Sequence, residues 1–273
     1  MLSHKDIKIN LGKGKFIYLD VFFSNKKKLI PVIFSHGFKG FKNWGFFDEI
    51  SEYFADNGCL FVKFNFSCNG VKMSEDYFSD LEAFSKNNLS KELDDLGFVI
   101  DWLLSSFYKE FIDLNNLTLI GHSRGGGVSM LKVSEDERVK RLVTWGSVYD
   151  FYSRPLFLRK DKCKQKGYME IFNTRTKQKM PIKYQFFEDL DKNYKRLSIK
   201  DNFKNSTNTL IIHGEEDNSI LVEEALSFAS LFNLKCEIIK GTGHTFDAKH
   251  PKQSYMPDKL MEVIEKTLKF IKS

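Results

Sequence analysis

The segment that decides the fold of this chain is Gly121-His122-Ser123-Arg124-Gly125-Gly126-Gly127. It follows a short apolar run at residues 117–120, which predicts a buried strand, and it precedes a helical pattern. A serine on such a tight strand-to-helix turn has a strained backbone and exposes its hydroxyl at the edge of the sheet. Side chains two positions before and after the serine would collide, which explains a glycine at both places. This context predicts that Ser123 is a nucleophile.

Strand-like and helix-like stretches alternate on both sides of this turn. Strands are predicted at residues 15–23, 29–34, 60–66, 117–120, 141–146, 209–212 and 235–239. Helices are predicted at residues 43–57, 92–107, 128–133, 221–232 and 257–271. This alternation is typical of an α/β fold, in which helices flank both faces of a mostly parallel sheet.

The alternation stops between residues 151 and 205. This segment carries 15 Lys and Arg against 6 Asp and Glu, whereas the rest of the chain carries 27 against 30. It is also rich in Phe and Tyr, and its periodicity is weak. Because the sheet pattern resumes afterwards, we expect one core made of residues 1–150 and 206–273. Residues 151–205 are then an inserted basic and aromatic cap.

The composition indicates a globular protein and argues against a membrane-spanning or zinc-binding one. The 273 residues suit one large α/β domain, and 42% apolar with 29% charged residues is a globular composition. No apolar run is long enough to span a bilayer, and the first residues lack the apolar region of a signal peptide. The four cysteines form no C-x-x-C pair and no zinc spacing. We expect a cytoplasmic protein with reduced thiols, no metal, no cofactor and no membrane partner.

A serine nucleophile needs a base, and the chain has six histidines. His244 lies in a short glycine-containing loop after the predicted strand at 235–239, and we expect it to be the base. His250, which precedes a proline, is the weaker candidate. The remaining histidines at strand ends are expected to be structural, and these are His36, His122 and His213.

An acid that orients the base is expected between the serine and the histidine in the chain. The segment after the predicted strand at 209–212 contains Glu215, Glu216 and Asp217. We expect Asp217 to be the acid, and the two glutamates remain alternatives. Asp247 is disfavoured because it is too close in sequence to His244.

A hydrolase of this kind also needs two N–H groups that stabilise an oxyanion. The stretch Ser35-His36-Gly37-Phe38-Lys39-Gly40 follows the predicted strand at 29–34 and precedes a helix. Together with the helix that opens after Ser123, it predicts that the backbone N–H groups of Phe38 and Arg124 form the oxyanion hole.

These four motifs occur in the order found in α/β-hydrolases, and between residues 30 and 246 the chain resembles that superfamily. It most resembles small serine carboxylesterases of the cinnamoyl or feruloyl esterase and dienelactone-hydrolase-like type. The resemblance implies an eight-stranded sheet, an acyl-enzyme on the serine and a cap after the sixth strand. Serine at the turn argues against haloalkane dehalogenases and epoxide hydrolases, which carry aspartate there. We expect no counterpart of the large N-terminal domain of prolyl-oligopeptidase-type peptidases.

The function expected from these residues is hydrolysis of a small-molecule carboxylic ester or thioester. The alternative is a non-catalytic hydrolase-fold protein that binds a ligand or a partner. A nucleic-acid partner is not expected, because the basic segment contains no recognised binding motif. If Arg154, Arg159 and Lys160 line the mouth of the site, the substrate is anionic. Aromatic residues of the cap would instead hold an aromatic acyl group, or would only pack the cap onto the core.

Overall fold

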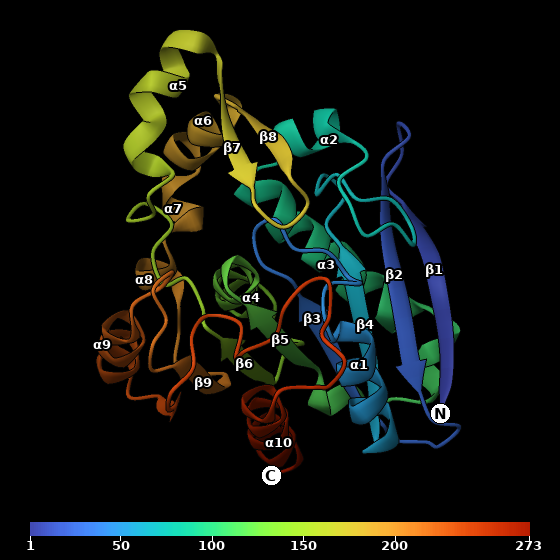
Figure 1. Ribbon diagram of the computed structural model, residues 1–273. Helices are drawn as coiled ribbons and strands as arrows, with labels where there is room; N and C mark the ends of the chain where they lie inside the picture. The colour runs from blue at the N-terminus through green and yellow to red at the C-terminus, as the bar shows by residue number, and fades with distance from the viewer.

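The computed structural model describes residues 1–273, and an eight-stranded sheet runs through it (Figure 1). The strands lie in the order β1 (Leu2–Asn10), β2 (Phe16–Phe23), β4 (Cys59–Asn65), β3 (Ile30–Ser35), β5 (Thr118–His122), β6 (Arg141–Trp145), β9 (Asn208–Gly214) and β10 (Lys235–Ile239). The pairs from β4 to β10 are parallel, whereas β1 and β2 are antiparallel additions at one edge. This arrangement confirms the predicted α/β-hydrolase fold class.

Helices connect the parallel strands and cover the sheet. They are α1 (Phe47–Asp56), α2 (Leu81–Ser85), α3 (Leu89–Ser105), α4 (Arg124–Glu135), α9 (Val222–Phe232) and α10 (Asp258–Lys272). The chain moves outward from β3 to β4 and then reverses to reach β5 on the other side of β3. Because such crossovers are right-handed, this reversal places α1 and α3 on opposite faces. The carboxyl ends of β3 and β5 are therefore a topological switch point, where α/β sheets bind ligands.

A single hydrophobic cluster fills the space between sheet and helices. On one face, the Phe34 ring contacts Phe47 of α1 and Trp145 of β6. The Trp145 indole donates a hydrogen bond of 3.0 Å to Thr267 of α10. These contacts join α1 and α10 to the centre of the sheet beneath the switch point.

Residues 151–205 lie beyond the carboxyl ends of the strands, at the top of Figure 1. They form α5 (Lys160–Lys166), the antiparallel hairpin of β7 (Tyr168–Asn173) and β8 (Gln178–Lys183), α6 (Gln185–Lys192), α7 (Tyr194–Leu197) and α8 (Ile199–Asn202). The segment is fixed to the core by hydrogen bonds, among them Gln178 with the backbone of Phe78 at 2.8 and 3.2 Å. Its hairpin was not predicted from the sequence.

Strand β1 was also missed by the sequence patterns. Its residues are mostly exposed, so the alternation of apolar and polar side chains is weak. The strand forms because β2 offers it a free edge, with seven paired positions and one irregularity between His4 and Ile7. Helix α4 begins at Arg124, four residues before the predicted start, because glycines conceal its first turn.

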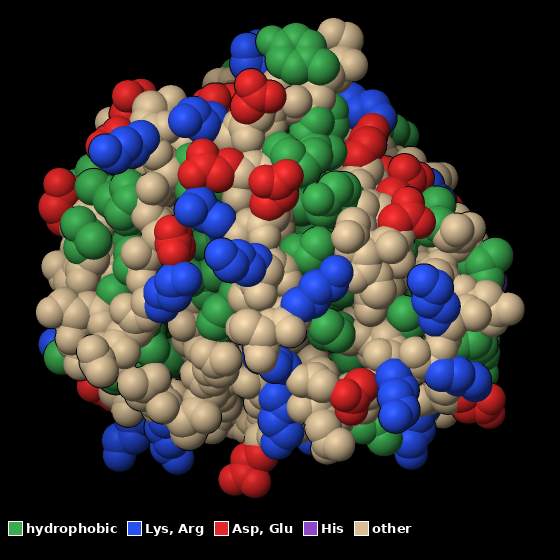
Figure 2. Space-filling model, turned by 90° about the horizontal axis from the view of Figure 1, so that it is seen from below, with side chains coloured by type: hydrophobic (Ala, Val, Ile, Leu, Met, Phe, Trp, Pro, Cys, Tyr) green, Lys and Arg blue, Asp and Glu red, His purple; other side chains and the backbone are tan.

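Figure 2 shows the end of the molecule seen from below the view of Figure 1. Basic and acidic side chains are interspersed there, and neither sign gathers into a patch. The four cysteines are unpaired. None of the helices combines the length and the apolar composition that crossing a membrane requires.

Candidate active site

The carboxyl edge of the sheet brings four loops together at the switch point. Ser123 lies on the turn between β5 and α4 with φ of 56°, the strained conformation expected for this turn. Asp217 follows β9, and His244 follows β10. The loop after β3 contributes Gly37 and Phe38. The order of the parallel strands therefore brings together residues as far apart in sequence as Gly37 and His244.

The predicted nucleophile, base and acid form one chain of hydrogen bonds. Ser123 Oγ lies 2.9 Å from His244 Nε2, and His244 Nδ1 lies 2.7 Å from Asp217 Oδ2. In the tautomer that these contacts favour, the Ser123 hydroxyl donates a hydrogen bond to Nε2, and Nδ1–H donates one to the Asp217 carboxylate. The structure thus brings together Ser123, His244 and Asp217.

The Asp217 carboxylate is held in place on both oxygens. Oδ1 accepts hydrogen bonds from the backbone N–H groups of Ser219 and Ile220, at 2.8 and 3.0 Å. Oδ2 lies 3.3 Å from His213 Nε2 in addition to its contact with His244. Burial raises the pKa of Asp217, but the hydrogen bonds from His213 and His244 outweigh burial and hold the pKa well below its ordinary value. The acid is therefore ionised and oriented before substrate arrives.

The loop after β3 packs directly against the nucleophile. A Cβ on Gly37 would lie 2.9 Å from Ser123 Cβ, so only glycine permits this approach. The backbone N–H of Phe38 makes no hydrogen bond within the chain. Arg124 is the first residue of α4, so its N–H has no acceptor inside that helix. The two N–H groups predicted to stabilise the oxyanion therefore belong to residues beside Ser123 and are free to donate a hydrogen bond.

Two other histidines support this arrangement. His122 Nε2 lies 3.0 Å from the backbone oxygen of His244 and donates to it when the ring is neutral. Burial is the main reason that the pKa of His122 is lowered to about 3, and it also lowers that of His36 to about 4. Both rings are neutral at pH 7, as the structural role expected for them requires. His250 lies outside the hydrogen-bonded chain, and its Nδ1 accepts from the Gly45 N–H at 3.2 Å.

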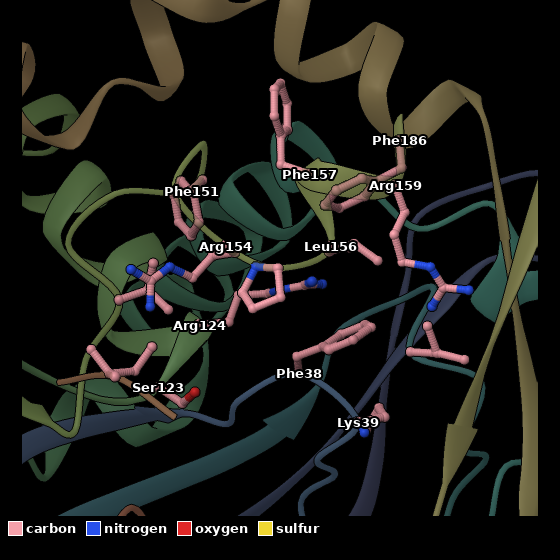
Figure 3. Close-up of a pocket in the computed structure, with 14 residues that line it drawn as sticks. Phe38, Lys39, Ser123, Arg124, Phe151, Arg154, Leu156, Phe157, Arg159 and Phe186 are labelled. Carbon is pink, nitrogen blue, oxygen red and sulfur yellow. The ribbon is translucent and has the colours of Figure 1, made fainter. Parts of the chain in front are cut away.

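A cavity of about 330 Å³ opens beside Ser123 under residues of the insertion (Figure 3). Its walls are mainly apolar, with aromatic and aliphatic side chains from Phe38, Phe151, Leu156, Phe157, Ile171 and Phe186. Five of these side chains belong to residues 151–205, and Phe38 comes from the loop after β3. The cavity is large enough for an acyl chain or an aromatic ring.

The Arg124 side chain forms part of this wall. Its guanidinium lies 3.8 Å from the centre of the Phe38 ring and 5.4 Å from that of Phe186. Its nitrogen Nη1 lies 3.4 Å from Glu92 of α3, and both side chains are buried. Arg124 thus joins the core to the insertion through its side chain.

A second, smaller cavity of about 50 Å³ also reaches Ser123 and shares Phe38 and Lys39 with the larger one. It is lined by the nucleophile, by His244 and by the oxyanion loop. Two cations also line it, Lys39 from the oxyanion loop and Arg175 from the turn of the β7–β8 hairpin.

The other charged residues considered from the sequence lie outside the hydrogen-bonded chain. Glu215 and Glu216 are exposed, and Asp247 accepts a hydrogen bond of 2.7 Å from Thr242 rather than from a histidine. Arg154 and Arg159 line the larger cavity, but Lys160 pairs with Asp191 and does not line it. Sequence reasoning missed Arg175, because no local pattern shows that the hairpin turn reaches Ser123.

Comparison with solved structures shows the same fold in several hydrolases. Est1E from Butyrivibrio proteoclasticus, solved with ferulic acid, is 17% identical over 97% of each chain, with a TM-score of 0.71. DcsB in complex with a substrate analogue is 20% identical over 97% of this chain and 98% of its own, with a TM-score of 0.72. The esterase domain of a Rhodothermus marinus protein is 17% identical over 99% and 98%, with a TM-score of 0.65. No curated protein sequence matches.

The fold and the site together define a serine hydrolase of the α/β-hydrolase class. The model of the prolyl oligopeptidase family matches residues 44–273, and the chain belongs to that family. The superfamily resemblance deduced from the motifs is confirmed.

Proposed function

We propose that the protein is a serine carboxylesterase that forms an acyl-enzyme on Ser123. The observation that carries this proposal is the unbroken hydrogen-bonded chain from Ser123 through His244 to Asp217, placed at the mouth of an apolar cavity. An apolar pocket next to an activated serine suits an ester with a hydrophobic or aromatic acyl group.

The first half of the reaction uses the residues in turn. Ser123 Oγ attacks the ester carbonyl while its proton passes to His244 Nε2. The carbonyl oxygen becomes an oxyanion, which accepts hydrogen bonds from the Phe38 and Arg124 N–H groups. The bond from carbon to the alcohol oxygen then breaks, and the His244 proton passes to that oxygen.

Water completes the cycle in the second half. It gives a proton to His244 and attacks the acyl-enzyme, and the acid leaves when the proton returns to Ser123 Oγ. Asp217 stays ionised throughout and stabilises the imidazolium. A thioester follows the same steps, with sulfur as the leaving atom.

The test is hydrolysis of p-nitrophenyl acetate, butyrate and octanoate by the wild type and by Ser123→Ala. We expect the wild type to prefer butyrate over acetate by about tenfold in kcat/KM, since each buried CH₂ contributes about 0.8 kcal/mol. The alanine variant should lose at least about three orders of magnitude. A fluorophosphonate probe should label the wild type on Ser123. Turnover that survives in Ser123→Ala, or an unlabelled serine, would contradict the proposal.

Peptide hydrolysis is a second candidate, favoured by the family to which the chain belongs. A peptidase that binds a free amino terminus needs a carboxylate near its nucleophile, because an ammonium group must be paired. Neither cavity beside Ser123 is lined by Asp or Glu. We therefore rank ester cleavage first. A proline-containing dipeptide p-nitroanilide, assayed beside the butyrate ester, distinguishes the two activities.

A further inference from the structure

The two cavities beside Ser123 have different roles in the reaction proposed above. The departing alcohol takes its proton from His244 Nε2, so it must lie on the side of the nucleophile where His244 lies. Only the smaller cavity is lined by His244. The larger apolar cavity therefore receives the acyl group, and the smaller cavity receives the leaving group.

Two cations face the leaving-group side without an acidic partner. Neither Lys39 Nζ nor the Arg175 guanidinium forms an ion pair with a carboxylate, and no carboxylate contributes to the pKa of either group. Lys39 comes from the oxyanion loop and is only partly exposed, with a backbone φ of 58°. Arg175 lies over the Trp44 ring, 5.4 Å from its centre, which holds the guanidinium at the mouth of the cavity.

On the acyl side, two of the cations that line the cavity are already paired. Arg124 faces Glu92, and Arg154 forms an ion pair with Glu224. Arg159 is exposed, as Arg175 is, but its guanidinium lies 3.5 Å from the backbone oxygen of Glu170 and not beside His244. In Figure 3 it lies across the cavity from Ser123. Lys39 borders both cavities, and Arg175 is the unpaired cation that lines only the smaller cavity, on the side of His244.

The two unpaired cations also act on each other. Burial lowers the pKa of the Lys39 ammonium, and the guanidinium groups of Arg175 and Arg124 lower it further. No carboxylate offsets this repulsion, and His122, which also lines the cavity, is neutral. An anion placed between Lys39 and Arg175 would relieve it.

We propose that the leaving alcohol of the natural ester carries an anionic group, a carboxylate or a phosphate, which Lys39 and Arg175 bind. This inference rests on the proposed esterase function and adds the chemical class of the leaving group. It moves the anionic specificity expected from Arg154, Arg159 and Lys160 to Arg175 of the hairpin turn and to Lys39 of the loop after β3.

The experiment compares three esters with one acyl group: 4-butyryloxybenzoate, 4-butyryloxybenzamide and 4-butyryloxyphenyl phosphate. Each kcat/KM is divided by the rate of hydroxide-catalysed hydrolysis of the same ester, which removes differences in intrinsic reactivity. We expect the carboxylate or the phosphate ester to exceed the neutral amide by at least about tenfold at low salt. The preference should shrink as ionic strength rises. The larger of the two ratios tells carboxylate from phosphate.

The variants identify the residues. In the double variant Lys39→Gln/Arg175→Gln, the ratio of anionic to neutral ester should fall to about one. The matched control is Lys179→Gln, which removes one positive charge from the same hairpin at an exposed position outside both cavities. It should keep the wild-type ratio.

Each outcome decides between the proposals. Hydrolysis of the neutral ester with no preference for either anion would overturn the anionic leaving group and leave the esterase function standing. An equal loss of preference in Lys179→Gln would assign the effect to net charge and would also overturn it. No turnover of any ester, together with no reaction of Ser123 with a fluorophosphonate, would overturn the proposed function itself.

Discussion

Arg124 has two tasks at the residue scale. Its backbone N–H is free at the start of α4, whereas its side chain packs on Phe38 and pairs with Glu92. Burial raises the pKa of Glu92, and the charge of Arg124 opposes that rise. The ion pair therefore depends on both partners, because either one alone would be a buried, uncompensated charge.

We expect Arg124→Met to destabilise the protein by roughly 3–5 kcal/mol, because it leaves Glu92 buried and unpaired. The double variant Arg124→Met/Glu92→Gln should recover most of this loss. Urea unfolding of the wild type, both single variants and the double variant gives the coupling free energy. Additive effects would show that the two side chains do not interact.

A second prediction concerns the acid. Asp217→Asn keeps acceptors for the Ser219 and Ile220 N–H groups, but the amide favours the wrong tautomer of His244. We expect kcat at pH 7 to fall by about three to four orders of magnitude with little change in thermal stability. A fall of less than about tenfold would mean that another acid, such as Glu215 or Glu216, serves the base.

Residue types and spacing predicted Ser123, His244 and Asp217 because each directly follows a strand of recognisable pattern. The same reasoning missed the contribution of His213 to Asp217, since a buried histidine four residues before an acid has no distinctive signature. It also missed Arg175, whose position depends on how the insertion folds back. The roles of residues that follow sheet strands can be predicted from the sequence, whereas the roles of residues positioned by tertiary packing cannot.

At the scale of elements, the start of α4 must lie close to the end of β3. A Cβ on Gly125 would meet the backbone oxygens of Ser35 and His36 at 2.3 and 2.5 Å. Both oxygens belong to the backbone at the end of β3, a central strand, so they cannot move aside to accommodate a Cβ. The distance between the nucleophile and the oxyanion loop is set by this contact.

We expect Gly125→Ala to push α4 away from β3 and to reduce kcat by at least about a hundredfold, because the oxyanion donors lose their alignment. The matched control is Gly97→Ala in the interior of α3, where the nearest atom is the flexible end of Lys132 at 3.2 Å. It should leave kcat unchanged and stabilise the protein by up to about 1 kcal/mol. Comparable activity in the two variants would refute this account.

Elements differ in how well sequence predicts them. Buried parallel strands such as β3 and β5 have continuous apolar runs and were placed within a residue or two. β1 is exposed on an edge, so its pairing with β2 rather than its own pattern makes it a strand. The β7–β8 hairpin alternates only weakly, because both its faces carry polar side chains.

At the scale of the whole molecule, a buried ionic network joins the N-terminal edge to the rest. Lys63 of β4 lies 2.9 Å from Asp20 of β2 and 2.5 Å from Asp48 of α1. Lys42, in the loop that follows the oxyanion turn, also lies 2.9 Å from Asp20. Lys63, Lys42 and Asp20 are almost completely buried. Three elements and the catalytic loop thus share one set of charges.

This network predicts acid sensitivity. Burial raises the pKa of Asp48, but Lys63 and Lys5 outweigh burial and hold it at about 2, and the pKa of Asp20 is likewise lowered. Aspartates in the unfolded chain titrate near 3.9, so between about pH 4 and pH 2 the unfolded state binds protons that the folded state does not. The free energy of unfolding should therefore fall as the pH falls through this window.

The measurement is urea unfolding at several pH values from 6 down to 2.5, with Asp48→Asn as the comparison. The variant should be less stable at pH 6 and should lose less stability across the window, since one of the titrating groups is gone. Curves of wild type and variant that stay parallel down to pH 2.5 would exclude Asp48 as a source of the acid sensitivity.

The path of the insertion has an evolutionary consequence. The proposed nucleophile, base and acid follow strands of the core, whereas Arg175 and most of the proposed acyl pocket belong to residues 151–205. After gene duplication, one copy can therefore diverge in residues 151–205 and change its substrate specificity while its catalytic residues stay the same. Such divergence needs the fewest mutations at the hairpin turn, because replacement of Arg175 alone changes the charge beside the proposed leaving group.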